Sequence, residues 1–235
     1  MTLIFIHGWG SFPEVWAGQK EFFGKEYKVI LPDISQAKNI KDAADIVCGA
    51  LPRAGDYVLT GWSLGWLVVL ELLKSFNLRP KAIISIASTA RFTDDGYLGA
   101  GPTSVHLAKM IRDCKKDPKR AYIDFYKMIL ADTGKEALVK VNLPPFDYNN
   151  LIYGLDILKS ADYRDFIETI NIPALIITGS KDTICPKEAS IYMHKIIKNS
   201  QLEMLDCGHM PFLSREQEFN NILESFIRAI ELNRD

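Results

Sequence analysis

Short apolar runs alternate with longer amphipathic segments along much of the chain. The first run, residues 3–6, is apolar at every position and is typical of a buried parallel strand. Similar patterns predict strands at residues 27–31, 57–60, 82–87, 174–178 and 202–205. Helical spacing of apolar residues predicts helices at residues 13–27, 40–51, 64–76 and 217–232. This alternation predicts an α/β fold with a mostly parallel sheet of about six strands.

The alternation stops between residues 91 and 170, where the pattern is helical and no good strand is evident. We interpret this segment as a helical cap inserted into a core formed by residues 1–90 and 171–235. The alternative is a poorly ordered linker. The many aromatic and aliphatic side chains of the segment argue against a linker, because they need a buried environment.

The bulk composition is that of a soluble globular protein, with 235 residues, 48% apolar residues and a formal net charge of -1. It gives no reason to expect nucleic acid or a membrane as a partner. No run reaches the roughly 20 apolar residues that span a bilayer, and the N-terminus does not resemble a signal peptide. The four cysteines lack metal-binding spacing, which favours reduced thiols in a cytoplasmic protein.

A G-x-S-x-G motif at residues 61–65 lies between a predicted strand and a predicted helix. We expect Gly61 to open a sharp turn that presents the hydroxyl of Ser63 beyond the sheet. The small glycines would allow the strained turn, and the following helix would direct its amides at a developing negative charge. The motif therefore predicts that Ser63 is a catalytic nucleophile.

A serine nucleophile needs a positioned base, and His209 is the best candidate of the four histidines. It follows the last predicted strand, so it should lie at the same sheet edge as Ser63. His106 and His194 fall in helical patterns and are interpreted as bystanders. His7 follows the first strand, where we expect it to hold a loop in place.

The acid that orients the histidine should come between Ser63 and His209 in the chain. Asp182 follows the fifth predicted strand and is our choice for this role. Asp206 competes, although a residue so close to the histidine along the chain rarely faces its ring. Asp156 is a weaker alternative. We expect the oxyanion to be bound by the backbone N–H groups of Trp9 and Leu64.

Four segments resemble the pimeloyl-[acyl-carrier protein] methyl ester esterase family of biotin synthesis, within the α/β-hydrolase superfamily. They are residues 7–10, 61–65, 154–159 and 208–212. The resemblance implies the α/β-hydrolase fold, here without the usual N-terminal hairpin, and a cytoplasmic, monomeric carboxylesterase. It implies the same roles for Ser63, Asp182 and His209, and it suggests that Trp9 and Trp62 line the acyl pocket. The expected chemistry needs neither a metal nor an organic cofactor.

Two departures from this family bear on the substrate. Trp66 replaces the usual glycine, and we expect its indole to contact and narrow the substrate pocket. The arginines with which the family's cap binds an acidic carrier protein are only partly matched, by Arg120, with Asp124 one turn later. The cap has its own basic cluster, namely Arg112, Lys115, Lys116, Lys119 and Arg120. This cluster could attract an acidic carrier protein, or it could be an ordinary solvated helix face.

We interpret the chain as a serine carboxylesterase that acts through an acyl-enzyme, with the methyl ester of carrier-bound pimelate as the expected substrate. The same residues would suit a general short-chain esterase, a thioesterase or a carbon–carbon bond hydrolase. A non-catalytic protein that binds a small ligand on this fold is the alternative from another class.

Overall fold

The computed structural model describes residues 1–96, 98, 101–134 and 149–232. Its six strands form one parallel sheet in the order β2-β1-β3-β4-β5-β6. The strands are β1 (Thr2–Ile6), β2 (Lys28–Ile30), β3 (Tyr57–Trp62), β4 (Ala82–Ile86), β5 (Ala174–Gly179) and β6 (Ser200–Leu205). The α/β fold and the parallel sheet predicted from the sequence are therefore confirmed.

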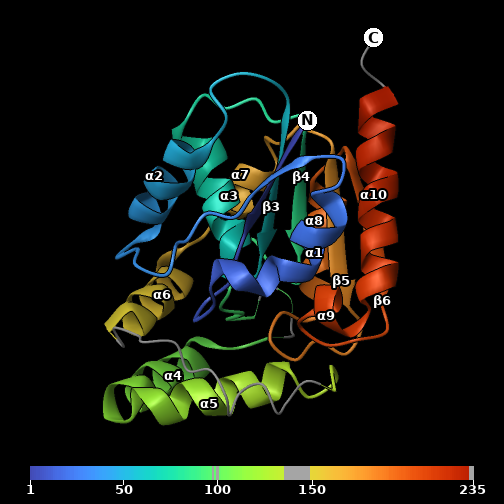
Figure 1. The fold of residues 1–235 in the computed structure, drawn as a ribbon. Helices are drawn as coiled ribbons and strands as arrows, with labels where there is room; N and C mark the ends of the chain where they lie inside the picture. The colour runs from blue at the N-terminus through green and yellow to red at the C-terminus, as the bar shows by residue number, and fades with distance from the viewer. Residues whose placement is uncertain (97, 99–100, 135–148, 233–235) are drawn as a thin grey trace.

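Helices flank the sheet, as Figure 1 shows. Helix α2 packs on α3 and helix α1 on α10, and the two pairs lie on opposite sides of the strands. The core helices are η1 (Pro13–Trp16), α1 (Ala17–Phe23), α2 (Ile40–Ala50), α3 (Leu64–Ser75), α8 (Lys187–Ile196), α9 (Pro211–Ser214) and α10 (Glu216–Leu232). Among the described residues, no helix is both long and apolar enough to cross a bilayer.

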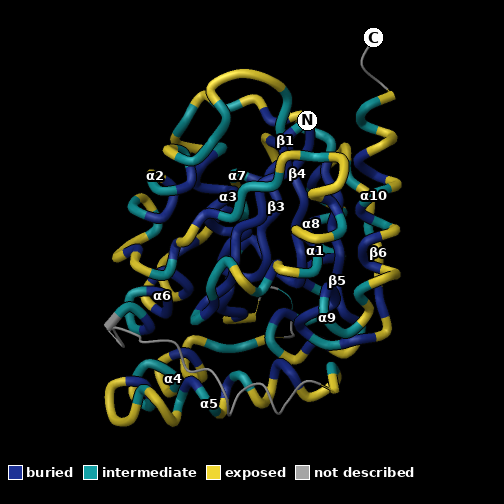
Figure 2. Tube along the Cα trace, in the orientation of Figure 1, coloured by how far each residue is buried: buried dark blue, intermediate teal, exposed yellow. Residues whose placement is uncertain are grey.

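The four central strands are almost fully buried, whereas the edge strands β2 and β6 are partly exposed (Figure 2). The aromatic core beside β1 joins distant parts of the chain. The ring of Trp16 lies 5.2 Å from that of Phe5 and 4.3 Å from that of Phe212, measured between centroids. Burial of this apolar surface fixes where η1 and α9 pack against the sheet.

The segment between β4 and β5 is a helical insertion, whose described helices are α4 (Ser104–Lys116), α5 (Pro118–Ile129), α6 (Asn149–Ser160) and α7 (Arg164–Ile167). Helices α4 and α5 lie near the carboxyl ends of the strands, whereas α7 lies beside α3, toward the other end of the sheet (Figure 1). We call this insertion the cap. Its division from the core at residues 90 and 170 stays a prediction.

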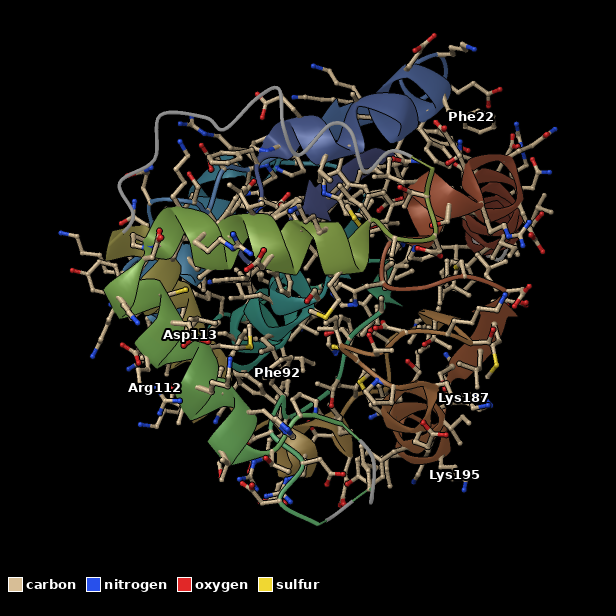
Figure 3. All side chains as sticks on the ribbon, turned by 90° about the horizontal axis from the view of Figure 1, so that it is seen from below. Phe22, Phe92, Arg112, Asp113, Lys187 and Lys195 are labelled. Atoms are coloured by element: carbon tan, nitrogen blue, oxygen red, sulfur yellow. The ribbon has the colours of Figure 1, made fainter. Side chains whose placement is uncertain are left out.

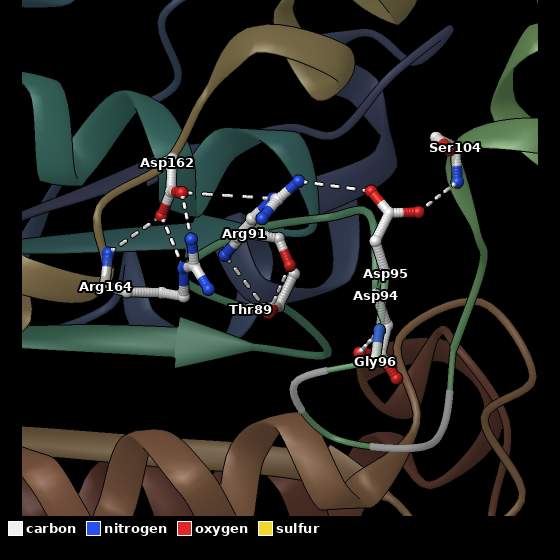
Figure 4. A network of polar contacts seen from close by, with 8 residues as sticks. All are labelled: Thr89, Arg91, Asp94, Asp95, Gly96, Ser104, Asp162 and Arg164. Carbon is white, nitrogen blue, oxygen red and sulfur yellow. Dashed lines mark hydrogen bonds and ion pairs between the residues drawn. The ribbon is translucent and has the colours of Figure 1, made fainter.

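Both ends of the cap are joined by a polar network that we call the clasp (Figure 4). Arg91 forms an isolated antiparallel bridge with Asp162, and its side chain contacts Asp95 at 3.2 Å and Asp162 at 3.9 Å. The guanidinium of Arg164 binds Asp162 at 2.6 Å. Asp95 in turn accepts a hydrogen bond from the amide of Ser104, at the start of α4. The clasp therefore ties the first cap helix to the return into the core.

Several element boundaries differ from the sequence prediction by a few residues, and one of them bears on the site. Strand β3 does not turn at Gly61 but continues through Trp62, which pairs with Ile86 of β4. The turn comes at Ser63, one residue before α3 begins. The glycine is required for another reason, because a side chain at position 61 would lie 2.5 Å from the backbone of Gly65.

Candidate active site

Ser63 lies in the turn between β3 and α3, with backbone angles φ 54° and ψ -119°. This left-handed conformation is strained for a serine. The amide of Ser63 donates to the carbonyl of Ile86, and its carbonyl accepts from the hydroxyl of Ser88 at 2.7 Å. The start of α3 also packs on β1, since a side chain at Gly65 would lie 2.4 Å from the carbonyl oxygen of Ile6. Neighbouring strands thus hold the serine in this conformation.

Asp182 and His209 form a buried pair. The Nδ1 atom of His209 lies 2.8 Å from Oδ2 of Asp182, and the side chains are 2% and 0% exposed. The other carboxylate oxygen accepts from the amides of Ile184 and Cys185 at 2.8 and 3.0 Å. Those two donors fix the carboxylate, so that Oδ2 accepts an Nδ1–H from the imidazole. The opposite ring nitrogen, Nε2, is then left as an acceptor.

That Nε2 atom is buried and makes no hydrogen bond with any described residue, the Ser63 hydroxyl included. A buried polar atom without a partner costs about 1–3 kcal/mol, and such atoms often mark functional sites. Trp62, which precedes Ser63, holds the histidine near the turn. Its indole N–H donates to the carbonyl of His209 at 2.9 Å, and the two rings lie 5.5 Å apart. Contacts between a base and its nucleophile are often loose without substrate and tighten when it binds.

The loop after β1 touches the turn that carries Ser63. A side chain at Gly8 would lie 3.2 Å from the Cβ atom of Ser63. The amides of Trp9 and Leu64 make no hydrogen bond with any described residue, and Leu64 is the first residue of α3. Free amides at a helix start and in a neighbouring loop can bind an oxyanion.

The cap holds the Trp9 side chain. Its indole N–H donates to the carbonyl of Leu151 at 2.8 Å, and its ring packs edge-on against Phe125 at 4.7 Å. A side chain at Gly154 would lie 2.4 Å from the indole, so α6 can approach this closely only through a glycine. The hydroxyl of Tyr126 donates to the carbonyl of Gly10 and adds a further contact from α5.

His7 bridges two loops in the core and is 1% exposed. Its Nε2 accepts from the amide of Ile34 at 3.1 Å, so its Nδ1, 3.0 Å from the carbonyl oxygen of Gly8, is the donor there. Both ring nitrogens are therefore used in holding the loop after β1.

The competing acids and histidines lie elsewhere. Asp206 is exposed and pairs with Lys181 at 2.8 Å, and this hydrogen bond lowers the pKa of its carboxyl. Asp156 is exposed on α6. His106 belongs to the capping box of α4, and His194 contacts the hydroxyl of Ser200.

The two further tryptophans assigned to the substrate are buried. Trp62 is 1% exposed and packs against Trp16 and Phe212, in addition to its contact with His209. Trp66 lies on α3 with no exposed surface. Their contact with substrate stays a prediction. For Trp66, such a contact would require the surrounding side chains to move.

All five residues of the basic cluster are exposed on α4 and α5, and Figure 3 shows Arg112 on the outer side of α4. Arg120 is paired with Asp124 at 2.6 Å. Between these helices runs a groove of about 530 Å³ with Trp9 among its lining residues. Apolar residues such as Met110 and Phe125 also line it, with acidic and basic residues beside them.

Sequence reasoning missed two polar residues near these groups. Ser88 follows β4 at the same sheet edge, a position that could have marked it. Asp132 follows α5 and accepts a hydrogen bond from the amide of Gly208, which precedes His209. No sequence pattern connects those two residues. The described part of the chain contains no cluster of three or more His, Cys, Asp or Glu residues suited to a metal ion.

The sequence model described as "Alpha/beta hydrolase family" matches residues 3–222. A pimeloyl-[acyl-carrier protein] methyl ester esterase from Neisseria meningitidis serogroup A is 28% identical, over 96% of this chain and 76% of the relative. A protein of the same name from Legionella pneumophila (strain Corby) is 27% identical, over 97% and 95%. Among solved structures, a bromoperoxidase from Bacillus anthracis superposes with a TM-score of 0.87 at 19% identity, over 97% and 91%. An esterase from Exiguobacterium antarcticum gives 0.85 at 23%, over 97% and 92%.

Proposed function

The chain belongs to the α/β-hydrolase family, and we propose that it is a serine carboxylesterase with Ser63 as the nucleophile. One observation carries this proposal. A buried imidazole, oriented by the carboxylate of Asp182, has a free Nε2 and is held beside the strained turn of Ser63 by Trp62. A base of this kind is what a serine hydroxyl needs to become a nucleophile.

The reaction follows from the positions of these groups. The Oγ atom of Ser63 attacks the ester carbonyl while its proton passes to Nε2 of His209. Asp182 stabilises the resulting imidazolium, and the amides of Trp9 and Leu64 bind the oxyanion. Collapse of the tetrahedral intermediate expels the alcohol, which takes the proton from His209. Water then attacks the acyl-enzyme in the same way, which releases the acid and restores Ser63.

We further propose that the substrate is the methyl ester of a carrier-bound pimeloyl chain. The names of the Neisseria and Legionella relatives support this substrate, as does the exposed basic cluster of the cap. Acidic carrier proteins would be attracted by such a surface at low ionic strength. The charge of Arg120 is offset by Asp124, with which it pairs. The attraction of an acidic carrier protein would therefore come chiefly from the other residues of the basic cluster.

The test uses two substrates, p-nitrophenyl acetate and the pimeloyl-carrier methyl ester. The proposed esterase hydrolyses the acetate, and Ser63→Ala abolishes this turnover. Absence of Ser63-dependent turnover on both substrates would refute the esterase. Turnover of the acetate alone would refute the carrier-bound substrate and leave a general short-chain esterase.

A double charge reversal, Lys115→Glu with Lys119→Glu, tests the basic cluster separately. It should lower kcat/KM for the carrier-bound ester more than for the acetate, and the difference should shrink as salt is added. Equal effects on both substrates would argue that the cluster is only a solvated helix face.

A further inference from the structure

Asp132, in the turn after cap helix α5, contacts the loop that carries His209. Its carboxylate accepts a hydrogen bond from the amide of Gly208. We propose that Asp132 is a positioning residue through which the cap holds His209 in its working orientation. The inference rests on the proposed function, because it assigns His209 the part of the base.

The turn that carries Asp132 is well defined by its own hydrogen bonds. The amide of Leu130 donates to the carbonyl of Tyr126 at 3.0 Å. The amide and the hydroxyl of Thr133 both bind the carbonyl of Leu130, at 2.9 and 2.8 Å, and Leu130 is buried. Figures 1 and 3 both show the end of α5 beside the turn at α9, where the loop of His209 continues. The carboxylate therefore projects from a fixed point of the cap.

Gly208 lies between this carboxylate and the end of β5. A side chain at Gly179 would lie 2.1 Å from the carbonyl oxygen of Gly208, so the core side leaves no free space. A side chain at Gly208 itself would lie 3.0 Å from the Asp132 carboxylate. A glycine at position 208 thus lets the cap carboxylate reach the backbone. The carboxylate is also close enough to act on the preceding residue, since burial and the nearby charge of Asp132 raise the pKa of the Cys207 thiol to about 12.

The loop is held from several sides, and Asp132 provides the side that belongs to the cap. The core fixes the imidazole through Asp182 and the carbonyl of His209 through Trp62. The preceding amide, that of Gly208, is held by Asp132. A base displaced by about 1 Å can lose about 100-fold in rate, so this one contact can affect turnover without touching substrate. Since the donor is a backbone N–H, any acceptor oxygen at the same place should serve.

The experiment compares Asp132→Ala, Asp132→Asn and the wild type, with Asp113→Ala as the control, a cap acid that pairs with Lys109 on its own helix. Two readouts are kcat and KM for p-nitrophenyl acetate and the low-field proton NMR signal of the His209 Nδ1–H. The alanine variant should lose about 10-fold in kcat with little change in KM, and its low-field signal should broaden or shift. Asparagine keeps an acceptor oxygen, so it should stay within about twofold of wild type, as should Asp113→Ala.

A wild-type kcat and a wild-type low-field signal in Asp132→Ala would overturn the proposal. An asparagine variant as impaired as the alanine variant would overturn it too, because charge rather than the hydrogen bond would then be responsible. Thermal unfolding checks that each variant is folded. If the wild type shows no Ser63-dependent turnover, the esterase fails, and the NMR signal alone still decides whether Asp132 positions the histidine.

Discussion

The core and the cap contribute to the candidate site in different ways. The core supplies Ser63, Asp182 and His209 from loops that follow three of its strands, β3, β5 and β6. The cap supplies contacts that hold loops of the core from outside, namely Leu151 on the indole of Trp9 in the loop after β1 and Asp132 on the amide of Gly208 in the loop after β6. The proposed chemistry is thus placed in the core, and part of its positioning in the cap.

The difference lies in how each region is held. Core groups follow strands whose hydrogen-bonded ladders fix their direction, so their relative placement needs few special contacts. The contacts of the cap with the loops of the site are made by individual groups, and the base of the cap is closed by one isolated bridge and by the partly exposed ion pairs of the clasp. We therefore expect core substitutions to affect chemistry most, and cap substitutions to act in proportion to the loop contact they remove.

The largest effect is expected from the core pair. In Asp182→Asn, the amide N–H₂ faces the imidazole and favours the wrong tautomer, so kcat should fall about 10,000-fold. Asp206→Asn is the matched control, since that exposed acid pairs with Lys181, and it should stay within about twofold of wild type. Steady-state kinetics on p-nitrophenyl acetate decide between the two acids. A larger loss in the Asp206 variant would reverse the assignment.

A single methyl group in the cap tests how far the cap can act on the core. Gly154→Ala would place a carbon 2.4 Å from the Trp9 indole and displace the loop whose amide is proposed to bind the oxyanion. We expect kcat/KM to fall about 100-fold.

Gly49→Ala, on α2, is the control for this substitution. A side chain there meets nothing within 4 Å, and kcat/KM should not change. Wild-type kinetics in Gly154→Ala would mean that the cap does not hold the oxyanion loop.

Two hydroxyl-to-carbonyl hydrogen bonds offer a direct comparison of core and cap. Ser88→Ala removes the contact with the Ser63 carbonyl and should lower the free energy of unfolding by about 1 kcal/mol. Ser160→Ala removes a similar contact with Asp156 on the exposed surface of α6 and should change it by less than about 0.5 kcal/mol. Urea denaturation measures both values, and equal losses would contradict the distinction.

At the clasp we expect a small effect on stability, no larger than that of Ser88→Ala. The hydrogen bond from Arg164 lowers the pKa of Asp162, so the folded protein binds fewer protons there than the unfolded chain. The stabilisation is therefore present at neutral pH and is lost as the pH falls below the ordinary aspartate pKa of about 3.9. Asp162→Asn should lower the free energy of unfolding by at most about 1 kcal/mol at pH 7, because the pair is partly exposed. A loss that persists in acid would contradict this account.

Periodicity in the sequence was sufficient for the core. Fully apolar runs such as residues 3–6 predicted the strands, because a strand buried on both faces leaves no polar position. The expectation that Ser63, Asp182 and His209 lie at one edge of the sheet came from the predicted strands that each of them follows. The position of the turn was wrong by two residues, since a glycine can serve close packing as well as a turn, and Gly61 serves packing against α3.

Contacts between regions could not be predicted in the same way. Asp132 and Gly208 are far apart in the sequence, and an aspartate after a helix and a glycine before a histidine are each common. The cap pattern indicated helices without indicating which face meets the core. The basic residues of α4 and α5 were visible, and the pairing of Arg120 with Asp124 is of the kind expected for a solvated helix face with charge pairs four residues apart.

Covalent labelling with a fluorophosphonate tests the central claim most directly, because it reports on Ser63 and His209 together without a choice of substrate. Mass spectrometry of the wild-type protein should find one adduct, located on Ser63. Labelling should be absent in Ser63→Ala and much slower in His209→Ala, in which the base is missing. An unlabelled wild type, or an adduct that forms equally well in Ser63→Ala, would contradict the account.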